Sequence, residues 1–280
     1  MIVGELSANG RVVDINIPES LREIPLSRFI PADIEYRRIL SDYGDILFST
    51  DYRYLESIVK FLGFVLDVDP NHLIGCKAGN IQNNAQKVAA GLDASKKWDS
   101  AEGTLLALFE HVAGLFSDVN PFSADISDFT INGKEYIIPD YLKKGLDYLS
   151  PNDLQTWQAV ECAETQRLLA QYVEGLKSDD DEIELSSFTD EQIAEYCQRN
   201  FNAYLRIIAS LLRPCDMTGL FDIESHITGL ASELQDIDTQ TAFDVFFSGL
   251  PIGGYYMEIL VSSISSIAQD LQEEPEPVPS

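Results

Sequence analysis

Histidine and cysteine, the residue types that most often bind metals or act as nucleophiles, are few and widely spaced in this sequence. They are His72, His111, His226, Cys76, Cys162, Cys197 and Cys215. No histidine has a second histidine three or four residues away, and no two cysteines form a Cys-x-x-Cys pair, which are spacings that metal sites use. We therefore predict no metal site. The cysteines are interpreted as small apolar side chains of a protein kept in a reducing compartment.

Motifs that bind phosphate or activate a nucleophile are also absent from the sequence. The glycine-rich string SGLPIGGYY at 248–256 has the spacing of no phosphate loop, and no strand-to-helix unit is predicted around it. The loop DVDPNHLIG at 67–75 lacks the alternating oxygen ligands and the terminal glutamate of a calcium loop. The sequence therefore predicts a protein that is not an enzyme and holds no cofactor.

Three arginines form the most regular pattern of charged residues. Arg199, Arg206 and Arg213 are seven residues apart on a helix predicted over 190–213. A spacing of seven drifts by only about 20° per step around a helix, so the three side chains share one line. The line could contact an acidic neighbouring protein. It could instead pair with acidic residues of the same chain, either in the acidic loop at 178–188 or in the helix predicted over 151–177. Pairing within the chain is favoured because it requires no partner, but both interpretations stay open here.

An acidic run, SDDDEIELSSF at 178–188, precedes the helix predicted over 190–213. Its residues Asp179, Asp180 and Asp181 belong either to a solvated loop or to a docking patch for a basic partner. Together with the three arginines, these aspartates are the residues that we assign to partner binding.

The whole chain is strongly acidic, with 46 Asp and Glu against 19 Lys and Arg and a formal net charge of −27. Such a surface repels phosphate backbones and anionic lipids, which argues against direct binding to nucleic acid or to a membrane surface. No stretch approaches the roughly 20 apolar residues of a spanning helix, and the N-terminus lacks the features of a secretory signal. We expect a cytoplasmic protein with protein partners, and homo-oligomerisation is left open.

Two similar strings indicate how the elements are arranged. They are NGRVVDINIPESL at 9–21 and NGKEYIIPDYL at 132–142, and each begins with the dipeptide that most strongly favours a hairpin turn. Each string predicts a β-hairpin whose last strand ends at a proline. The apolar strand residues are Val13, Ile15 and Ile17 in the first hairpin and Phe129, Ile131, Tyr136 and Ile138 in the second.

Helical periodicity fills most of the remaining sequence. Helices are predicted over 54–66, 80–92, 101–116, 154–176, 190–213, 223–236, 239–249 and 254–271. The helix over 190–213 has the strongest pattern, because Thr189 and Gln192 have the spacing of a capping box at its start. Its broad apolar face consists of Ile193, Tyr196, Cys197, Phe201, Tyr204, Leu205, Ile208, Leu211 and Leu212.

A hairpin followed by helices thus occurs twice. This order predicts an α+β fold, mainly α-helical, with two lobes that arose by internal duplication. The lobes are predicted over 1–117 and 130–271, with a polar linker over 118–129 and an acidic, proline-rich tail over 272–280 that does not fold alone. The alternative to duplication is chance similarity between two common Asn-Gly hairpins.

Two stretches of the chain are similar to bacteriophage proteins. The runs INIPESLREIPLSRFI and YLESIVKFLGFVLDVDPNHLIG resemble the unit of phage tail-assembly-chaperone-like proteins, in which a short β-element leads into helices. The second half resembles structural-module proteins of podovirus-like and crAss-like phages. The residues that carry this resemblance are Asn132, Gly133, Tyr136, Ile138, Pro139, Arg213, Pro214, Phe246, Phe247 and Leu250. The helix start LSPNDLQTW departs from those sequences, which often have a Gly-Glu-Tyr-type string there.

The resemblance implies a non-catalytic phage morphogenesis protein that binds other phage structural proteins. An assembly chaperone for tail or other virion proteins, working in the host cytoplasm, is the first hypothesis. A permanent virion component, such as a tail, ring or cargo protein, is the alternative within this class. An acidic mimic of DNA that inhibits a nucleic-acid-binding enzyme is a third hypothesis, but a mimic should gather its carboxylates in rows, whereas here they are dispersed along the chain.

Overall fold

The chain forms two compact units, each assembled from segments that are distant in the sequence. The computed structural model describes residues 2–8, 11–43, 52–74, 76–83, 101–117, 128–144, 154–174, 176, 189–217 and 222–249. The first unit comprises 1–123, 183–201 and 235–243, and the second comprises 124–182, 202–234 and 244–280. Residues 183–201 and 235–243, which the sequence assigned to the second lobe, thus belong to the first unit.

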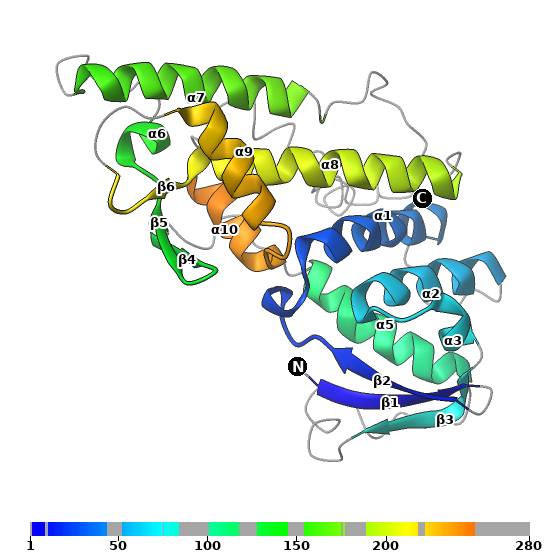
Figure 1. The fold of residues 1–280 in the computed structure, drawn as a ribbon. Coiled ribbons are helices and arrows are strands. Elements are labelled where there is room, and N and C mark those ends of the chain that lie inside the picture. The colour runs from blue at the N-terminus through cyan, green and yellow to red at the C-terminus, as the bar shows by residue number, and fades with distance from the viewer. Residues whose placement is uncertain are drawn as a thin grey trace, which may run out of the picture. The chain divides into compact units, whose positions relative to one another are not determined.

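The predicted fold class is confirmed. The described residues are mainly α-helical and contain two small antiparallel sheets, each of three strands (Figure 1). The described helices include none that is long and apolar enough to cross a bilayer. Residues 118–127 of the predicted linker and the predicted tail over 272–280 lie outside the described residues.

The first hairpin is confirmed and is completed by a strand that the sequence did not indicate. Strands β1 (Ile2–Ala8) and β2 (Arg11–Ile17) pair in the register that a two-residue turn requires, with Ala8 opposite Arg11. A third strand, β3 (Cys76–Asn83), pairs antiparallel with β1 and gives the order β2-β1-β3. The helix predicted over 80–92 is therefore wrong at its start, because 80–83 belong to β3, where their backbone groups pair with β1. Its remainder lies outside the described residues.

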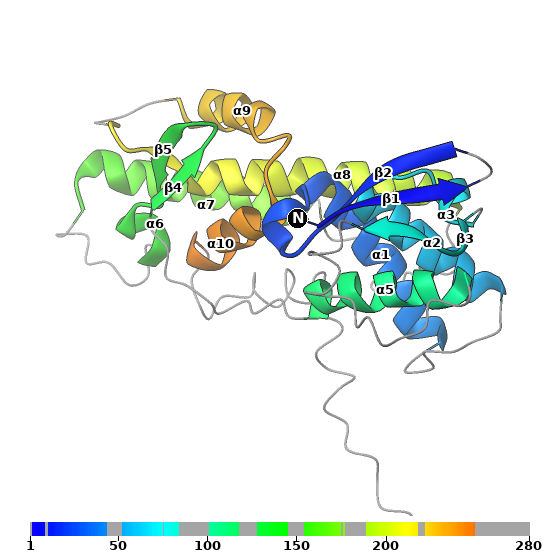
Figure 2. The same cartoon turned by 90° about the horizontal axis from the view of Figure 1, so that it is seen from below.

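Helices cover one face of this first sheet. The helices of the first unit are α1 (Leu26–Tyr43), α2 (Tyr52–Leu66), α3 (Pro70–Ile74) and α5 (Ala101–Ser117), preceded by a short 3-10 helix at Leu21–Glu23. Helix α2 contacts β2, α3 contacts β1, and α5 contacts β3. Both ribbon views place these helices on the same side of the strands (Figures 1 and 2).

Aromatic side chains form the centre of the first unit. The rings of Phe29 and Phe116 are stacked with their centroids 4.6 Å apart, and Phe243 meets Phe29 edge-on at 5.3 Å. Phe61 contacts Phe116 edge-on at 5.1 Å, and Tyr36 lies 5.8 Å from Phe61. Such pairs contribute about 0.5–1.5 kcal/mol each beyond the burial of apolar area, so this cluster holds α1, α2, α5 and α10 together.

Within the first unit, a short backbone connection joins two segments that are far apart in the sequence. The Leu26 amide donates to Ile237 O at 2.9 Å, and the Thr239 amide donates to Ile24 O at 2.9 Å. The Thr239 hydroxyl donates to the same Ile24 carbonyl at 2.7 Å and is fully buried. Residues 237–239 thus pair with residues 24–26 across a separation of more than 200 residues.

The second unit begins with the second predicted hairpin, which is confirmed. Strands β4 (Asp128–Ile131) and β5 (Lys134–Ile137) flank the turn residues Asn132 and Gly133, whose φ angles are 51° and 74°. Both angles lie in the left-handed region that a type I′ turn needs. The predicted apolar side chains of this hairpin, Phe129, Ile131, Tyr136 and Ile138, are all buried.

The second sheet also has a third strand, but its order differs from that of the first. Strand β6 (Arg213–Pro214) pairs with β5 and gives the order β4-β5-β6. The second strand of the hairpin is therefore central in this unit, whereas the first strand is central in the other unit. Internal duplication stays a prediction.

Helices α6 (Asp140–Lys144), α7 (Thr156–Glu174) and α9 (Ile223–Glu233) complete the second unit. Two further helices, α8 (Asp190–Leu211) and α10 (Thr239–Gly249), contribute residues to both units. The predicted capping box of α8 is confirmed, because the Thr189 amide donates to Gln192 Oε1 at 2.9 Å and the Gln192 amide donates to Thr189 Oγ1 at 3.3 Å. The predicted apolar face of α8 is buried or half-buried along its whole length.

The β4–β5 turn generates a prediction about two glycines of the second unit. Gly133→Ala places a Cβ on a residue whose φ is 74°, so we expect the free energy of unfolding to fall by about 1 kcal/mol. The matched control is Gly229→Ala in α9, where a Cβ meets nothing within 4 Å and the higher helix propensity of alanine should raise stability by up to about 1 kcal/mol. Urea unfolding measures both variants. Equal effects of the same sign would contradict the assigned turn.

Candidate functional site

The arginine line predicted on α8 loses one of its members. Helix α8 ends at Leu211, two residues before the predicted end, and Arg213 lies in β6, where it is buried. Arg199 and Arg206 are exposed, and each places its guanidinium over a tyrosine ring, that of Tyr196 at 5.4 Å and that of Tyr172 at 5.7 Å. Their role in partner binding stays a prediction. Asp179, Asp180 and Asp181 lie outside the described residues.

Arg213 instead forms the buried charge pair of the second unit. Its Nε donates to Glu161 Oε1 at 2.5 Å, and both side chains are only 1% exposed. Its other donors reach Thr165 Oγ1 at 2.9 Å and the carbonyl oxygens of Ser210 and Leu212 at 2.7 and 2.9 Å. This is the pairing within the chain, to the helix over 151–177, that the sequence left open.

Tyr141 completes this cluster of buried polar groups. Its hydroxyl donates to Glu161 Oε2 at 3.1 Å, so both oxygens of that carboxylate have a donor. Burial and the neighbouring Glu161 charge raise the pKa of Tyr141 well above its ordinary value, which keeps the hydroxyl protonated. Every contact in the cluster holds the fold of α6, α7 and β6 in place. We assign it a structural role.

Two of the three histidines form hydrogen bonds to backbone carbonyl oxygens, and these contacts are also structural. The Nε2–H of His111 donates to Pro18 O at 3.0 Å, and that of His226 donates to Leu212 O at 2.9 Å. Burial lowers the pKa of His226, which favours its neutral form. The part of the chain that the structure describes contains no group of three or more His, Cys, Asp or Glu arranged to hold a metal ion.

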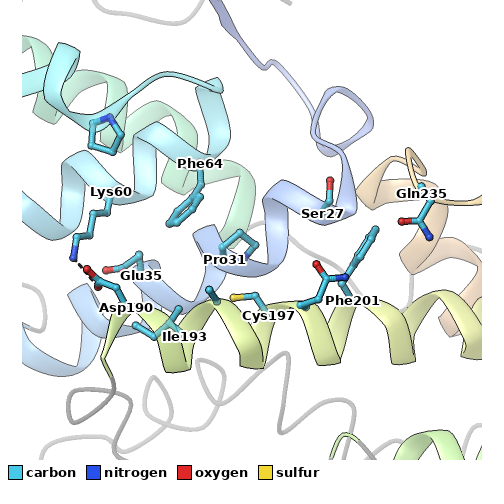
Figure 3. A pocket seen from close by; sticks show the side chains of 13 residues that line it. Ser27, Pro31, Glu35, Lys60, Phe64, Asp190, Ile193, Cys197, Phe201 and Gln235 are labelled. Carbon is cyan, nitrogen blue, oxygen red and sulfur yellow. Dashed lines mark hydrogen bonds and ion pairs between the residues drawn. The ribbon is translucent and has the colours of Figure 1, made fainter.

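A groove of about 540 Å³ in the first unit is the candidate binding site (Figure 3). We call it the α1–α8 groove, since α1, α2 and the first half of α8 supply most of its lining. Its apolar residues are Pro31, Phe64, Pro70, Ile193, Ala194, Cys197 and Phe201. Figure 3 shows Glu35, Lys60 and Asp190 together at one end, with Phe201 and Gln235 toward the other.

Backbone features of two helices shape this groove. Pro31 lies inside α1 and has no N–H, so it cannot donate the helical hydrogen bond to the Ser27 carbonyl, and both residues line the groove. Gly63 of α2 allows Pro70 to approach closely, because a Cβ at residue 63 would lie 3.0 Å from Pro70 Cγ and 3.0 Å from Val68 O. Pro70 is thereby placed at the groove wall.

The charged end of the groove contains a carboxylate that is only half paired. Glu35 Oε1 accepts from Arg38 Nη1 at 3.1 Å, and the Glu35 side chain is 3% exposed. Its second oxygen, Oε2, is buried and has no hydrogen-bond partner among the described residues. Lys60 Nζ donates to Asp190 Oδ1 at 3.2 Å and lies 3.6 Å from Glu56 Oε1.

This environment shifts the protonation of the groove residues. Burial raises the pKa of Glu35, and the opposing attraction of Arg38 and Lys60 does not cancel that effect. Lys60 loses hydration on burial, but Asp190, Glu35 and Glu56 together raise its pKa, so its ammonium stays charged. Cys197 lies between the two ends, where burial and the Glu35 charge raise the pKa of its thiol to about 11.

Glu35 was missed by the sequence reasoning, although a signal was present. Ala32, Glu35, Tyr36 and Ile39 follow the i, i+3, i+4, i+7 pattern of a buried helical stripe, and all four are buried. An acidic residue within such a stripe is removed from water on folding, and it therefore indicates a candidate functional site.

Comparison with known proteins identifies no relative: no family model matches the chain, and no curated protein or solved structure is significantly similar to it.

The buried pair of the second unit yields a prediction with its own internal control. Arg213→Met leaves Glu161 as an unpaired buried charge, and Glu161→Leu leaves Arg213 unpaired, so each should lower the free energy of unfolding by about 3–5 kcal/mol. The double variant leaves neither charge and should lose less than either single variant. Arg206→Met, on the surface, should cost at most about 1 kcal/mol. Losses that simply add in urea unfolding would contradict the pairing.

A second prediction concerns stability and pH at Glu35. Because the folded-state pKa is raised above the ordinary value of 4.5, ionisation of Glu35 destabilises the folded chain increasingly as pH rises from about 4.5 through the folded pKa. Glu35→Gln, a mimic of the protonated form, should therefore raise the melting temperature at pH 7. The gain in unfolding free energy is about 1.4 kcal/mol for each pH unit between the folded and unfolded pKa.

The sign of this effect is tested by thermal melting between pH 4 and pH 8. Below pH 4.5 the carboxyl is protonated in both states, so the gain should disappear there. The control is Glu195→Gln on the exposed side of α8, which should change stability by no more than about 0.5 kcal/mol at either pH. A gain for Glu35→Gln that is larger at pH 4 than at pH 7 would contradict the assignment.

Proposed function

We propose that the chain is a non-catalytic bacteriophage morphogenesis protein, an assembly chaperone that holds segments of tail or other virion proteins before they are built into the particle. The observation that carries this proposal is the α1–α8 groove. It combines an open apolar surface, on which the Phe64 side chain is 39% exposed, with a charged end whose buried carboxylate is half paired. Such a surface suits a protein segment that is apolar and not yet assembled.

The charge of the chain supports the same proposal. A net charge of −27 makes copies of the chain repel one another and keeps a complex with an apolar segment soluble. The same charge attracts basic partners and disfavours phosphate-bearing ligands. The phage origin rests on the similarity of the two sequence stretches to tail-assembly-chaperone-like and structural-module proteins.

A permanent virion component would use the same surface for a lasting contact instead of a transient one. The two functions differ in whether the chain leaves before the particle is complete, and the test below separates them by the location of the chain.

The proposal is tested in the phage that encodes the chain. Deletion of its gene should prevent the formation of infectious particles and leave incomplete tails or heads in electron micrographs, and a plasmid copy of the gene should restore them. Mass spectrometry of purified wild-type particles should find none of the chain. Stoichiometric amounts in the particles would replace the chaperone with a virion component. An unchanged particle yield after deletion would overturn both.

A further inference from the structure

We propose that the α1–α8 groove binds a partner segment in which a lysine or arginine lies next to bulky apolar side chains, with the cation pairing with Glu35. This inference deepens the proposed function and rests on it for the statement that the partner is a phage structural protein. The partner chemistry itself follows from the groove alone.

The groove contains a buried carboxylate with an unsatisfied oxygen. Glu35 lines the groove, and its Oε2 is buried without a hydrogen-bond partner among the described residues while Oε1 is occupied by Arg38. Buried carboxylate oxygens are normally paired, because an unpaired one keeps the full cost of its lost hydration. An incoming N–H donor that carries a positive charge removes this cost most effectively.

The charges at this end of the groove also favour a cationic partner. With all five side chains ionised, the carboxylates of Glu35, Glu56 and Asp190 outnumber the two cations, Arg38 and Lys60, by one negative charge. One side chain of lysine or arginine balances the cluster. An acidic or phosphorylated segment would meet both this excess charge and the negative field of the whole chain.

The remainder of the groove is mainly apolar and favours bulky apolar side chains beside the cation. A free amine would fill only the charged end and would leave Phe64, which is 39% exposed, and the half-buried Pro31 in contact with water. The volume of about 540 Å³ falls in the range of about 300–1,000 Å³ that ligand sites occupy, which is enough for a few side chains. A segment with both kinds of side chain therefore fills the groove better than a small cation.

A second copy of this chain is a poor occupant. It brings 46 acidic against 19 basic residues, so two copies repel each other at the distances over which they would meet. A basic segment of a different protein is favoured by the same field that opposes self-association.

The test uses the full chain and two libraries of fluorescein-labelled twelve-residue peptides. Both libraries are rich in Leu and Phe, and they differ only at one central position, which is Lys or Arg in the first and Gln in the second. Fluorescence polarisation should show binding at least tenfold tighter for the first library. Glu35→Gln should remove at least tenfold of that affinity, whereas Glu195→Gln, which makes the same charge change outside the groove, should alter it less than twofold.

A second readout locates the bound peptide. Cys197 lines the groove, and Cys215 is an exposed free thiol of the second unit. Iodoacetamide labelling at pH 9, followed residue by residue by mass spectrometry, should slow at least fivefold at Cys197 when a Lys or Arg peptide is bound and stay unchanged at Cys215. Because Glu35→Gln is expected to fold at least as stably as the parent chain, its loss of affinity would not reflect unfolding.

Three results would overturn the inference. They are equal affinity for the two libraries, an unprotected Cys197 with a bound peptide, and a dimer in light scattering that Glu35→Gln dissociates, which would assign the groove to self-association. None of them depends on the phage experiment. If the peptide test fails while gene deletion still blocks assembly, the chaperone uses another surface. If the peptides bind and deletion has no effect, the proposed phage role is wrong but the proposed binding site in the groove is retained.

Discussion

Removing a charge from water requires a partner inside the protein, and the two units meet this requirement to different degrees. In the second unit the Arg213 guanidinium has acceptors from α7, from the end of α8 and from Leu212, the residue before its own strand, and both oxygens of Glu161 have donors. The cluster is closed, so it stabilises the fold and offers nothing to a ligand. In the first unit Glu35 is equally buried, yet one of its oxygens has no donor in the part of the chain that the structure describes. The same physical constraint produces a structural centre in one unit and the proposed binding site in the other.

Local patterns were sufficient to predict the elements whose stability is local. The Asn132-Gly133 turn follows from the rarity of other residues with positive φ, and the strands on either side follow from alternation. The start of α8 follows from the Thr189 and Gln192 spacing, and its buried face follows from the 3.6-residue period. The mainly helical α+β class needed no more than these patterns.

Features that depend on distant partners could not be predicted in this way. Strand β3 is polar and does not alternate, and β6 has only two residues, so each exists because a neighbouring strand offers unpaired backbone groups. Arg213 was placed on a helix, although the residue before a proline is driven toward extended conformations and Pro214 follows it. The half-paired state of Glu35 depends on which side chains of α2 and α8 arrive beside it, which no window of sequence contains.

The pairing of residues 24–26 with residues 237–239 has a consequence during synthesis. A ribosome adds roughly 5–20 residues per second, so Thr239 emerges roughly 10–40 s after Ile24. Until then the Phe29 ring lacks its edge-on contact with Phe243, so the aromatic cluster of the nascent first unit is incomplete. Contacts of such long range also slow the final folding step. A protein proposed to shield incompletely assembled partners is therefore itself incompletely folded while it is being synthesised. A message truncated before codon 237 yields a first unit that lacks the pairing between residues 24–26 and 237–239.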